Sequence, residues 1–384
     1  MPEPRPRLAA IFLAFLRLGS TAFGGPAMVP YIREMAVNKK GWISEELFRT
    51  GMALCQSVPG ATAMQVAAYV GLRARGLSGA LAAYLGFGLP AFCLITALSA
   101  LYATSQEVQP VLAAFTGLKF VVVALIANAS LDFARTYLTH APDKVIALGT
   151  GLVLGLKGNP ILAIIGACLV GLVLYRHMDG PAPELCCTHK NPVRRLLLLC
   201  IPLAGLLAAL ALLHPGLFDL AMVMFKVDLF AFGGGYVSLP LMLHEVTTAR
   251  TWMSPEMFMD GIALGQVTPG PIVITSAFVG HHLYGLAGAV VAGVFAFVPS
   301  LVILVGVTPY FDRLQSSPLF RRAVRASLAS LVGLMAAVFA RFAVSAPWSP
   351  LGAVLCLTAF IALRARVDIL WVVLAGAGLS VLVL

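Results

Sequence analysis

The sequence GMALCQSVPG at residues 51–60 returns as GIALGQVTPG at residues 261–270, so the chain repeats itself after 210 positions. Two further motif pairs flank this one at nearly the same spacing. They are FGG at 23–25 and 232–234, and WISEELF at 42–48 with WMSPEMF at 252–258. Because Gly, Pro, Trp and Gln all stay in register, chance does not explain the match. The chain therefore consists of two related halves.

The composition around this repeat is that of a membrane protein. Hydrophobic residues make up 60% of the 384 positions, charged residues only 11%, and the mean hydropathy is +0.94. Soluble domains carry roughly 25% charged residues. Apolar runs at 196–213, 286–307 and 370–384 approach the ~20 residues that cross a bilayer. We expect an all-α polytopic membrane protein with about 11–13 hydrophobic segments.

Several other classes of protein are disfavoured. The seven cysteines are scattered along the chain and do not suggest a disulfide framework. In so apolar a chain, the net charge of +10 indicates basic cytoplasmic loops and not a nucleic-acid partner. The sequence lacks a haem-attachment motif, a four-cysteine cluster and a dinucleotide-binding fingerprint. We therefore expect no enzyme activity, no cofactor and no metal.

The chain divides at a polar stretch that contains MDGPAP. We expect a first repeat at 1–175, a cytoplasmic linker at 176–192, and a second repeat at 193–384 with one extra N-terminal helix. That helix makes the number of crossings between equivalent segments odd, which predicts an inverted repeat. With the N-terminus in the cytoplasm, most loop Lys and Arg residues also lie in the cytoplasm.

Whether the broken segments of each half cross the membrane or re-enter on the same side stays open. Glycine pairs and Pro-Gly interrupt the apolar segments at matching positions of the two halves. Broken helices inside a membrane expose backbone N–H and C=O groups, which are tolerated where protein or a water-filled cavity satisfies them. Inverted repeats with such breaks are typical of secondary transporters. Each half-helix that begins at a break offers unpaired N–H groups and a positive dipole end, which favours an anion.

Two basic residues support an anionic substrate. Arg17 and Lys226 each lie six residues before the Phe-Gly-Gly motif of their half, and a cation inside a membrane is costly. Alternatively, Arg17 extends to the membrane interface, Lys226 pairs with Asp228, and the glycines serve only close helix packing. Lys119 lies within an apolar segment and has no counterpart that the sequence aligns. Asp132, Asp228, Glu245 and Asp260 are candidate proton carriers.

The predicted substrate site combines these cations with the breaks and their polar neighbours. Its residues are Arg17, Gly24, Gly25, Gln56, Pro59, Gly60, Thr62, Lys226, Gly233, Gly234, Gln266, Thr268, Pro269 and Gly270.

The motifs resemble those of the chromate ion transporter family, specifically its long members with two fused halves. The matching elements are FGGP at 23–26, LCQ at 54–56 with PG at 59–60, GFGLP at 86–90, FGGGY at 232–236, QVTPGP at 266–271 and FVP at 297–299. The resemblance implies a multi-pass carrier of the bacterial inner membrane that exports chromate and confers resistance. Its partners would be the lipid bilayer and a small tetrahedral oxyanion such as chromate or sulfate. An anion channel, another inorganic anion and a homodimer stay open as alternatives.

Overall fold

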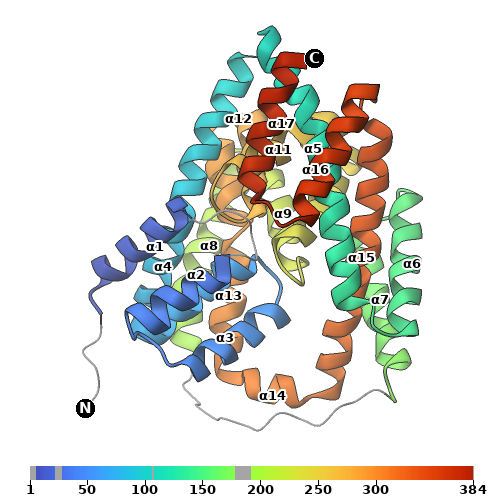
Figure 1. The fold of residues 1–384 in the computed structure, drawn as a ribbon. Coiled ribbons are helices and arrows are strands. Elements are labelled where there is room, and N and C mark those ends of the chain that lie inside the picture. Colours follow the sequence, from blue (N-terminus) through green and yellow to red (C-terminus); the bar gives the residue numbers. More distant parts are fainter. Residues whose placement is uncertain (1–5, 22–27, 106–107, 178–191, 384) are drawn as a thin grey trace.

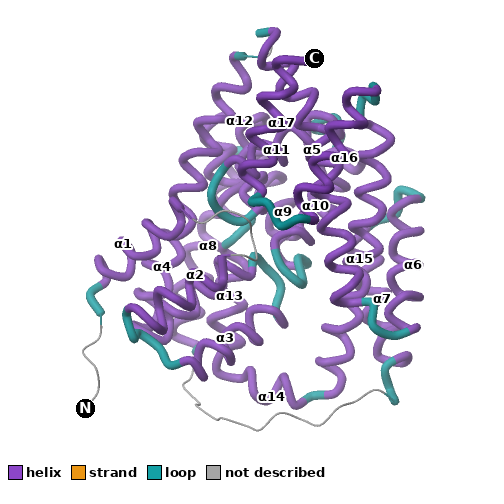
Figure 2. The backbone as a smooth tube through the Cα atoms, viewed as in Figure 1, coloured by secondary structure: helices purple, strands orange, loops and turns teal. Residues whose placement is uncertain are grey.

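The computed structural model describes residues 6–21, 28–105, 108–177 and 192–383. Within these ranges the chain is built of helices joined by short loops, and no strand occurs (Figure 2). Five stretches are long and apolar enough to cross a membrane, and several shorter apolar helices accompany them. Large apolar side chains are exposed along α6, α7, α8, α16 and α17. The protein is therefore an all-α polytopic membrane protein, as the composition predicts.

The first half contains seven helices within the described ranges. They are α1 (Leu8–Thr21), α2 (Met28–Arg33) with a π-helical turn at Glu34–Lys39, α3 (Glu45–Ser57), α4 (Thr62–Thr104), α5 (Gln109–Tyr137), α6 (Ala141–Gly155) and α7 (Pro160–Leu174). Helix α8 (Val193–Leu213) follows the linker region and has no buried residue.

The second half repeats this order. Its elements are α9 (Pro215–Leu229), a 3-10 turn at Gly235–Val237, α10 (Ser238–Leu243) with a π-helical turn at His244–Ala249, α11 (Pro255–Val267), a 3-10 turn at Ile272–Ile274, α12 (Thr275–Phe295), α13 (Val298–Val307), α14 (Phe311–Ser316), α15 (Pro318–Ser345), α16 (Pro350–Arg364) and α17 (Ile369–Val383).

Local signals in the sequence set equivalent boundaries in the two halves. Helices α3 and α11 begin after Ser44 and Ser254, whose hydroxyls accept hydrogen bonds from backbone N–H groups three residues later. Gly76 and Gly285 have φ values of 70° and 57° and bend α4 and α12 at the same place. The repeat in the sequence is therefore a repeat in the structure.

The two halves exchange their C-terminal helices. Helix α5 of the first half packs against α16 and α17 of the second, while α15 packs against α6 and α7 of the first (Figure 1). Phe120 near the start of α5 contacts Gly352 of α16, and Asp132 near the end of α5 pairs with Arg364, so these helices run parallel. Neither half can bury its long helix alone.

Helices α5 and α15 are equivalent and antiparallel. Phe120 of α5 packs on Trp348, just beyond the end of α15, whereas Thr136 near the end of α5 shares a cavity with Leu328 near the start of α15. Equivalent helices of opposite direction are what an inverted repeat requires.

Glycine allows the exchanged helices to approach closely. Gly333 of α15 lies against the carbonyl oxygen of Ala147 on α6, where a Cβ atom has no room. The hydroxyl of Thr150 on α6 donates to the carbonyl of Ser330 at 3.0 Å beside this contact. Small residues at such crossings let backbones meet in membrane proteins.

We expect Gly333→Ala to destabilise the protein, although Ala normally favours a helix. The added methyl group meets Ala147, and overpacking of this kind costs about 1–3 kcal/mol. Gly149→Ala on α6 is the control, because no atom lies within 4 Å of the added methyl. Thermal unfolding in detergent should show a lower melting temperature for Gly333→Ala alone. Equal melting temperatures for the two variants would contradict this packing.

Candidate functional site

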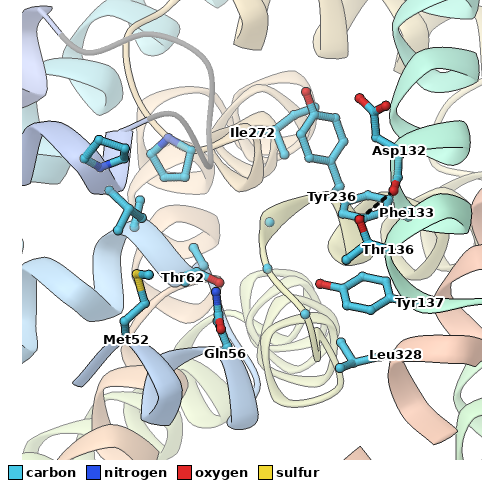
Figure 3. A pocket seen from close by; sticks show the side chains of 18 of the residues that line it. Met52, Gln56, Thr62, Asp132, Phe133, Thr136, Tyr137, Tyr236, Ile272 and Leu328 are labelled. Carbon is cyan, nitrogen blue, oxygen red and sulfur yellow. Dashed lines mark hydrogen bonds between the residues drawn. The ribbon is translucent and has the colours of Figure 1, made fainter. Parts of the chain in front are cut away.

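A cavity of about 600 Å³ lies where the two halves meet. Its walls come from α2, α3 and the start of α4 on one side, and from α5, the turn after α9 and the start of the Ile272–Ile274 turn on the other (Figure 3). Elements of both repeats therefore build one cavity.

Four helical starts converge on this cavity. Its lining contains Val29 from the first turn of α2, Thr62 from the first turn of α4, Gly235 before α10 and Ile272 before α12. A Cβ atom at Gly234 would lie 3.2 Å from the hydroxyl of Thr62, and one at Gly235 would lie 3.3 Å from Ile272. The breaks of the two halves thus lie next to each other.

Backbone N–H groups at these starts are available to a ligand. Among the described residues, the N–H groups of Thr62 and Ala63 have no hydrogen-bond partner, and the same holds for residues 233–236 and for Ile272. Helix first turns leave such donors unpaired, and their partial positive charge favours an anion. Within the described part of the chain, the cavity is therefore lined by N–H donors that no protein group accepts from.

The Pro-Gly breaks are fixed by the opposite half. Gly60 and Gly270 have φ values of 121° and 127°, a region that side chains rarely adopt. The N–H of Gly60 donates to the carbonyl of Ala231 at 2.9 Å. A Cβ atom at Gly60 would overlap Ser300, and one at Gly270 would approach Ala91. Because Ala91 and Ser300 are equivalent positions, each half supports the break of the other in the same way.

Buried polar side chains bind several backbone groups next to the breaks. The amide of Gln65 donates to the carbonyl of Pro59 at 2.5 Å, and the hydroxyl of Tyr84 donates to the carbonyl of Phe297 at 2.6 Å. Asp228 accepts a hydrogen bond from the N–H of Ser300 at 2.7 Å, so its carboxylate binds the start of α13. These contacts keep the breaks rigid.

Fixed charges at the edge of the cavity are paired. The guanidinium of Arg33 lies 2.8 Å from the carboxylate of Glu45, and Arg364 binds the carboxylate of Asp132 at 2.6 Å. Uncharged polar side chains complete the lining, and Figure 3 shows Gln56, Thr62, Tyr137 and Tyr236 around the central space. Attraction for an anion therefore comes mainly from N–H donors and helix dipoles.

The structure brings together part of the predicted site. Gln56, Thr62, Gly233 and Gly234 line the cavity. Pro59 and Gly60 form the buried break immediately before α4. The equivalent break before α12 consists of Gln266, Thr268, Pro269 and Gly270, all buried. Gly24 and Gly25 lie outside the described residues.

The two predicted cations do not line the cavity in this conformation. Arg17 is exposed on α1, and Lys226 is half-buried on α9. The end of α5 contributes instead, with Phe133, Thr136 and Tyr137. Tyr137 corresponds to Ala346 at the end of α15, so the repeat did not point to it. The pair of hydroxyl residues that ends α5 was the available signal.

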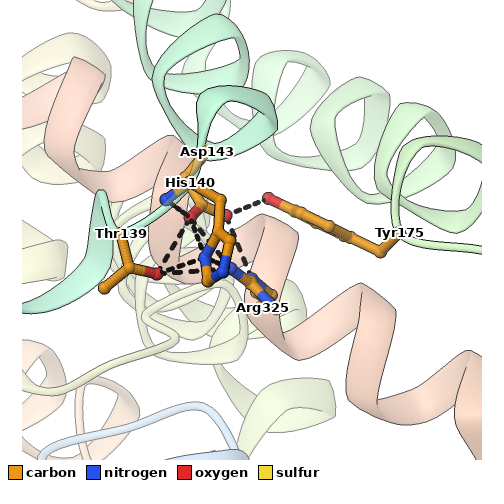
Figure 4. A network of polar contacts seen from close by, with 5 residues as sticks. All are labelled: Thr139, His140, Asp143, Tyr175 and Arg325. Atoms are coloured by element: carbon orange, nitrogen blue, oxygen red, sulfur yellow. Dashed lines mark hydrogen bonds and ion pairs between the residues drawn. The ribbon is translucent and has the colours of Figure 1, made fainter. Parts of the chain in front are cut away.

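A second cavity of about 310 Å³ adjoins the first and shares Thr136, Tyr137 and Leu328 with it. Arg321 and Arg325 lie in its wall. Arg325 binds the fully buried carboxylate of Asp143 at 3.0 Å, and the hydroxyl of Tyr175 donates to the same carboxylate at 2.6 Å (Figure 4). This network ties α15 to α6 and α7 beside the mouth of the cavity.

Known proteins share this sequence pattern. The profile of the chromate transporter family matches residues 9–172 and again residues 218–381. An uncharacterized transporter of Methanocaldococcus jannaschii is 39% identical over 99% of this chain and 95% of its own length. The chromate transport protein of Pseudomonas aeruginosa is 31% identical over 80% of this chain and 73% of its own. That of Cupriavidus metallidurans is 28% identical over 86% and 81%. No solved structure matches the chain.

We expect Gly60→Ala to damage the break and to lower both the yield of folded protein and its melting temperature. The substitution combines an unfavourable φ with overlap on Ser300. Gly41→Ala is the control, because its φ is 59° but no atom lies within 4 Å, and strain alone costs about 1–2 kcal/mol. A Gly60→Ala protein as stable as Gly41→Ala would show that the contact between the halves is unimportant.

Proposed function

Because the chain belongs to the chromate transporter family, we propose that it carries chromate or a similar tetrahedral oxyanion across the membrane. The family consists of transporters and not of enzymes. The observation that carries the proposal is the convergence of four helical starts on one cavity, three of which have N–H groups without a partner among the described residues.

The chemistry of the cavity fits such a substrate. Sulfate and the chromate dianion have four oxygens that accept hydrogen bonds and donate none. N–H groups that approach from several directions can each bind a different oxygen, and hydrogen bonds to a charged acceptor are strong. Hydroxyl groups of Thr62, Tyr137 and Tyr236 add further donors. The charged side chains at the rim are already paired with each other, so the negative charge of the substrate would be stabilised by the N–H groups at the helix starts.

The inverted repeat supports a carrier in preference to a channel. The cavity is open between α3 and α5, whereas the equivalent helix α11 packs against α5 and α17. A conformation open on one side and closed on the other is what alternating access requires. A channel would instead need a path that is open to both sides at once.

The direction that we propose is export. Arg321 and Arg325 lie in the cavity that adjoins the substrate site, close in the chain to the further cations Arg313 and Arg322. Positive loops mark the cytoplasmic side, so the cavity would load from the cytoplasm. In a bacterial inner membrane, with the N-terminus in the cytoplasm, this carrier would remove chromate and confer resistance.

Transport into everted membrane vesicles tests the proposal. We expect accumulation of radiolabelled chromate in vesicles that contain the protein, and competition by excess sulfate because it has the same shape and charge. Vesicles without the protein are the control. Accumulation of neither chromate nor sulfate would contradict the proposed substrate class.

The role of the backbone N–H groups can be tested at Thr62. Thr62→Pro removes the hydroxyl and the N–H, yet Pro is tolerated at the first position of a helix and Ala61 already has an extended backbone. Thr62→Ala removes the hydroxyl only. A hydrogen bond to a charged group contributes about 1.5–3 kcal/mol, so the half-saturating chromate concentration should rise at least tenfold more in Thr62→Pro. Equal values for the two variants would exclude this N–H as a ligand.

Neutralisation of the two predicted cations gives a further test. Neither Arg17 nor Lys226 lines the cavity, so Arg17→Gln combined with Lys226→Gln should change the half-saturating chromate concentration by less than about threefold. Measurement in vesicles at equal expression checks this. A tenfold or larger rise in the half-saturating chromate concentration would show that these residues do contribute to substrate binding.

A further inference from the structure

A polar cluster closes the protein on the side away from the open cavity. The ammonium group of Lys119 on α5 lies 3.8 Å from the carboxylate of Asp260 on α11. The hydroxyl of Tyr102, near the end of α4, donates to the same carboxylate at 2.9 Å. The side chains of Lys119 and Asp260 are only 18% and 7% exposed. Three helices from both halves therefore meet at one buried charge pair.

The equivalent positions in the other half are apolar or uncharged. The sequence motifs align no counterpart for Lys119, but α5 and α15 are equivalent helices, and counting from their first residues pairs Lys119 with Leu328. The offset of the repeat pairs Asp260 with Thr50 and Tyr102 with Phe311. Leu328 lies in the wall of the open cavity. The ion pair is thus a departure from the repeat, and it occurs on one side only.

The packing of the two halves differs at the same place. Helix α11 packs against α5 and α17, with the Lys119–Asp260 pair in the contact. Its counterpart α3 packs mainly on α4 and, among the described residues, makes no comparable contact with α15, the counterpart of α5; the open cavity lies beside α3. The side that has the ion pair is closed, and the side that lacks it is open.

We propose that Lys119, Asp260 and Tyr102 form the gate that keeps the side opposite the open cavity closed. The inference rests on the proposed carrier mechanism. In the alternate state, α11 would separate from α5 as its counterpart α3 is separated from α15 here, and α3 would close on α15. The gate contributes to the balance between the two states, because the pair holds only one of the two sides closed.

The energetics of the cluster favour a gate that can open. A half-buried ion pair gains attraction but loses hydration, so its net stabilisation is modest. One carboxylate oxygen of Asp260 has no hydrogen-bond partner within the described part of the chain. A small cavity of about 290 Å³ beside the pair is also lined by Thr116 and Glu256. Water that enters this cavity would stabilise the separated charges after opening.

Two matched reporter positions can follow the states. Met52 lines the open cavity, and its repeat counterpart Ile262 is fully buried. We would place Met52→Cys or Ile262→Cys in protein whose seven native cysteines are replaced, and measure the rate of modification by a small thiol reagent. The parent protein should react rapidly at position 52 and slowly at position 262.

The ion pair of the gate is removed by replacing Lys119 and Asp260 with the residues found at the equivalent positions of the other half. In the Lys119→Leu, Asp260→Thr protein, we expect modification at position 262 to accelerate at least tenfold and modification at position 52 to slow. Both charges are replaced together because one alone would leave an unpaired buried charge. The reversed pair, Lys119→Asp with Asp260→Lys, should retain the parent rates.

The reciprocal variant adds the pair to the open side. Thr50→Asp with Leu328→Lys should slow modification at position 52 at least tenfold. If removing the pair leaves both rates within twofold of the parent in protein that elutes as a single folded species, the gate is overturned. Failure of the carrier proposal would appear separately, as absent chromate uptake with normal labelling.

Discussion

Backbone N–H groups that the fold leaves unpaired inside a membrane are the constraint on which the structure depends. Each such group is costly in a bilayer unless protein, water or a ligand satisfies it. Here the breaks at Pro59-Gly60 and Gly233-Gly234 turn the unpaired groups toward one cavity between the halves. An anion that accepts hydrogen bonds from these N–H groups would remove the free-energy cost of leaving them unpaired. The site therefore needs no unpaired cation of its own.

The same constraint explains why the halves are interlocked. A broken helix keeps its shape only if its flanks are held, and here each half holds the other, through Ser300 against Gly60 and Ala91 against Gly270. The exchange of α6 and α7 for α16 and α17 adds the long contacts along α5 and α15. Outside this rigid frame lie the α2–α3 and α10–α11 regions, whose packing against the rest of the protein differs between the two halves. Motion of these parts about a fixed centre would give alternating access.

The sequence predicted the repeat, its inversion and the breaks, because glycine, proline and capping serine act locally and keep their spacing. It did not predict the end of α5 as part of the site, since Tyr137 reaches the cavity only through packing between halves. The equal spacing of Arg17 and Lys226 from Phe-Gly-Gly suggested a shared site, but neither residue lines the cavity in this conformation. Lys119 pairs with Asp260 on α11 of the other half. An alignment of the repeats could not predict this pair, because it joins positions that are not equivalent.

The most direct test of this account is to locate the bound anion in the protein. Crystals of the protein with chromate, measured with X-rays on both sides of the chromium absorption edge, would give a difference signal from chromium that marks the anion. The account predicts one main peak in the cavity, within hydrogen-bonding distance of the N–H groups of Thr62 and Gly234. A main peak beside Arg17 and Lys226, with the cavity empty, would contradict the claim that the helix breaks form the substrate site.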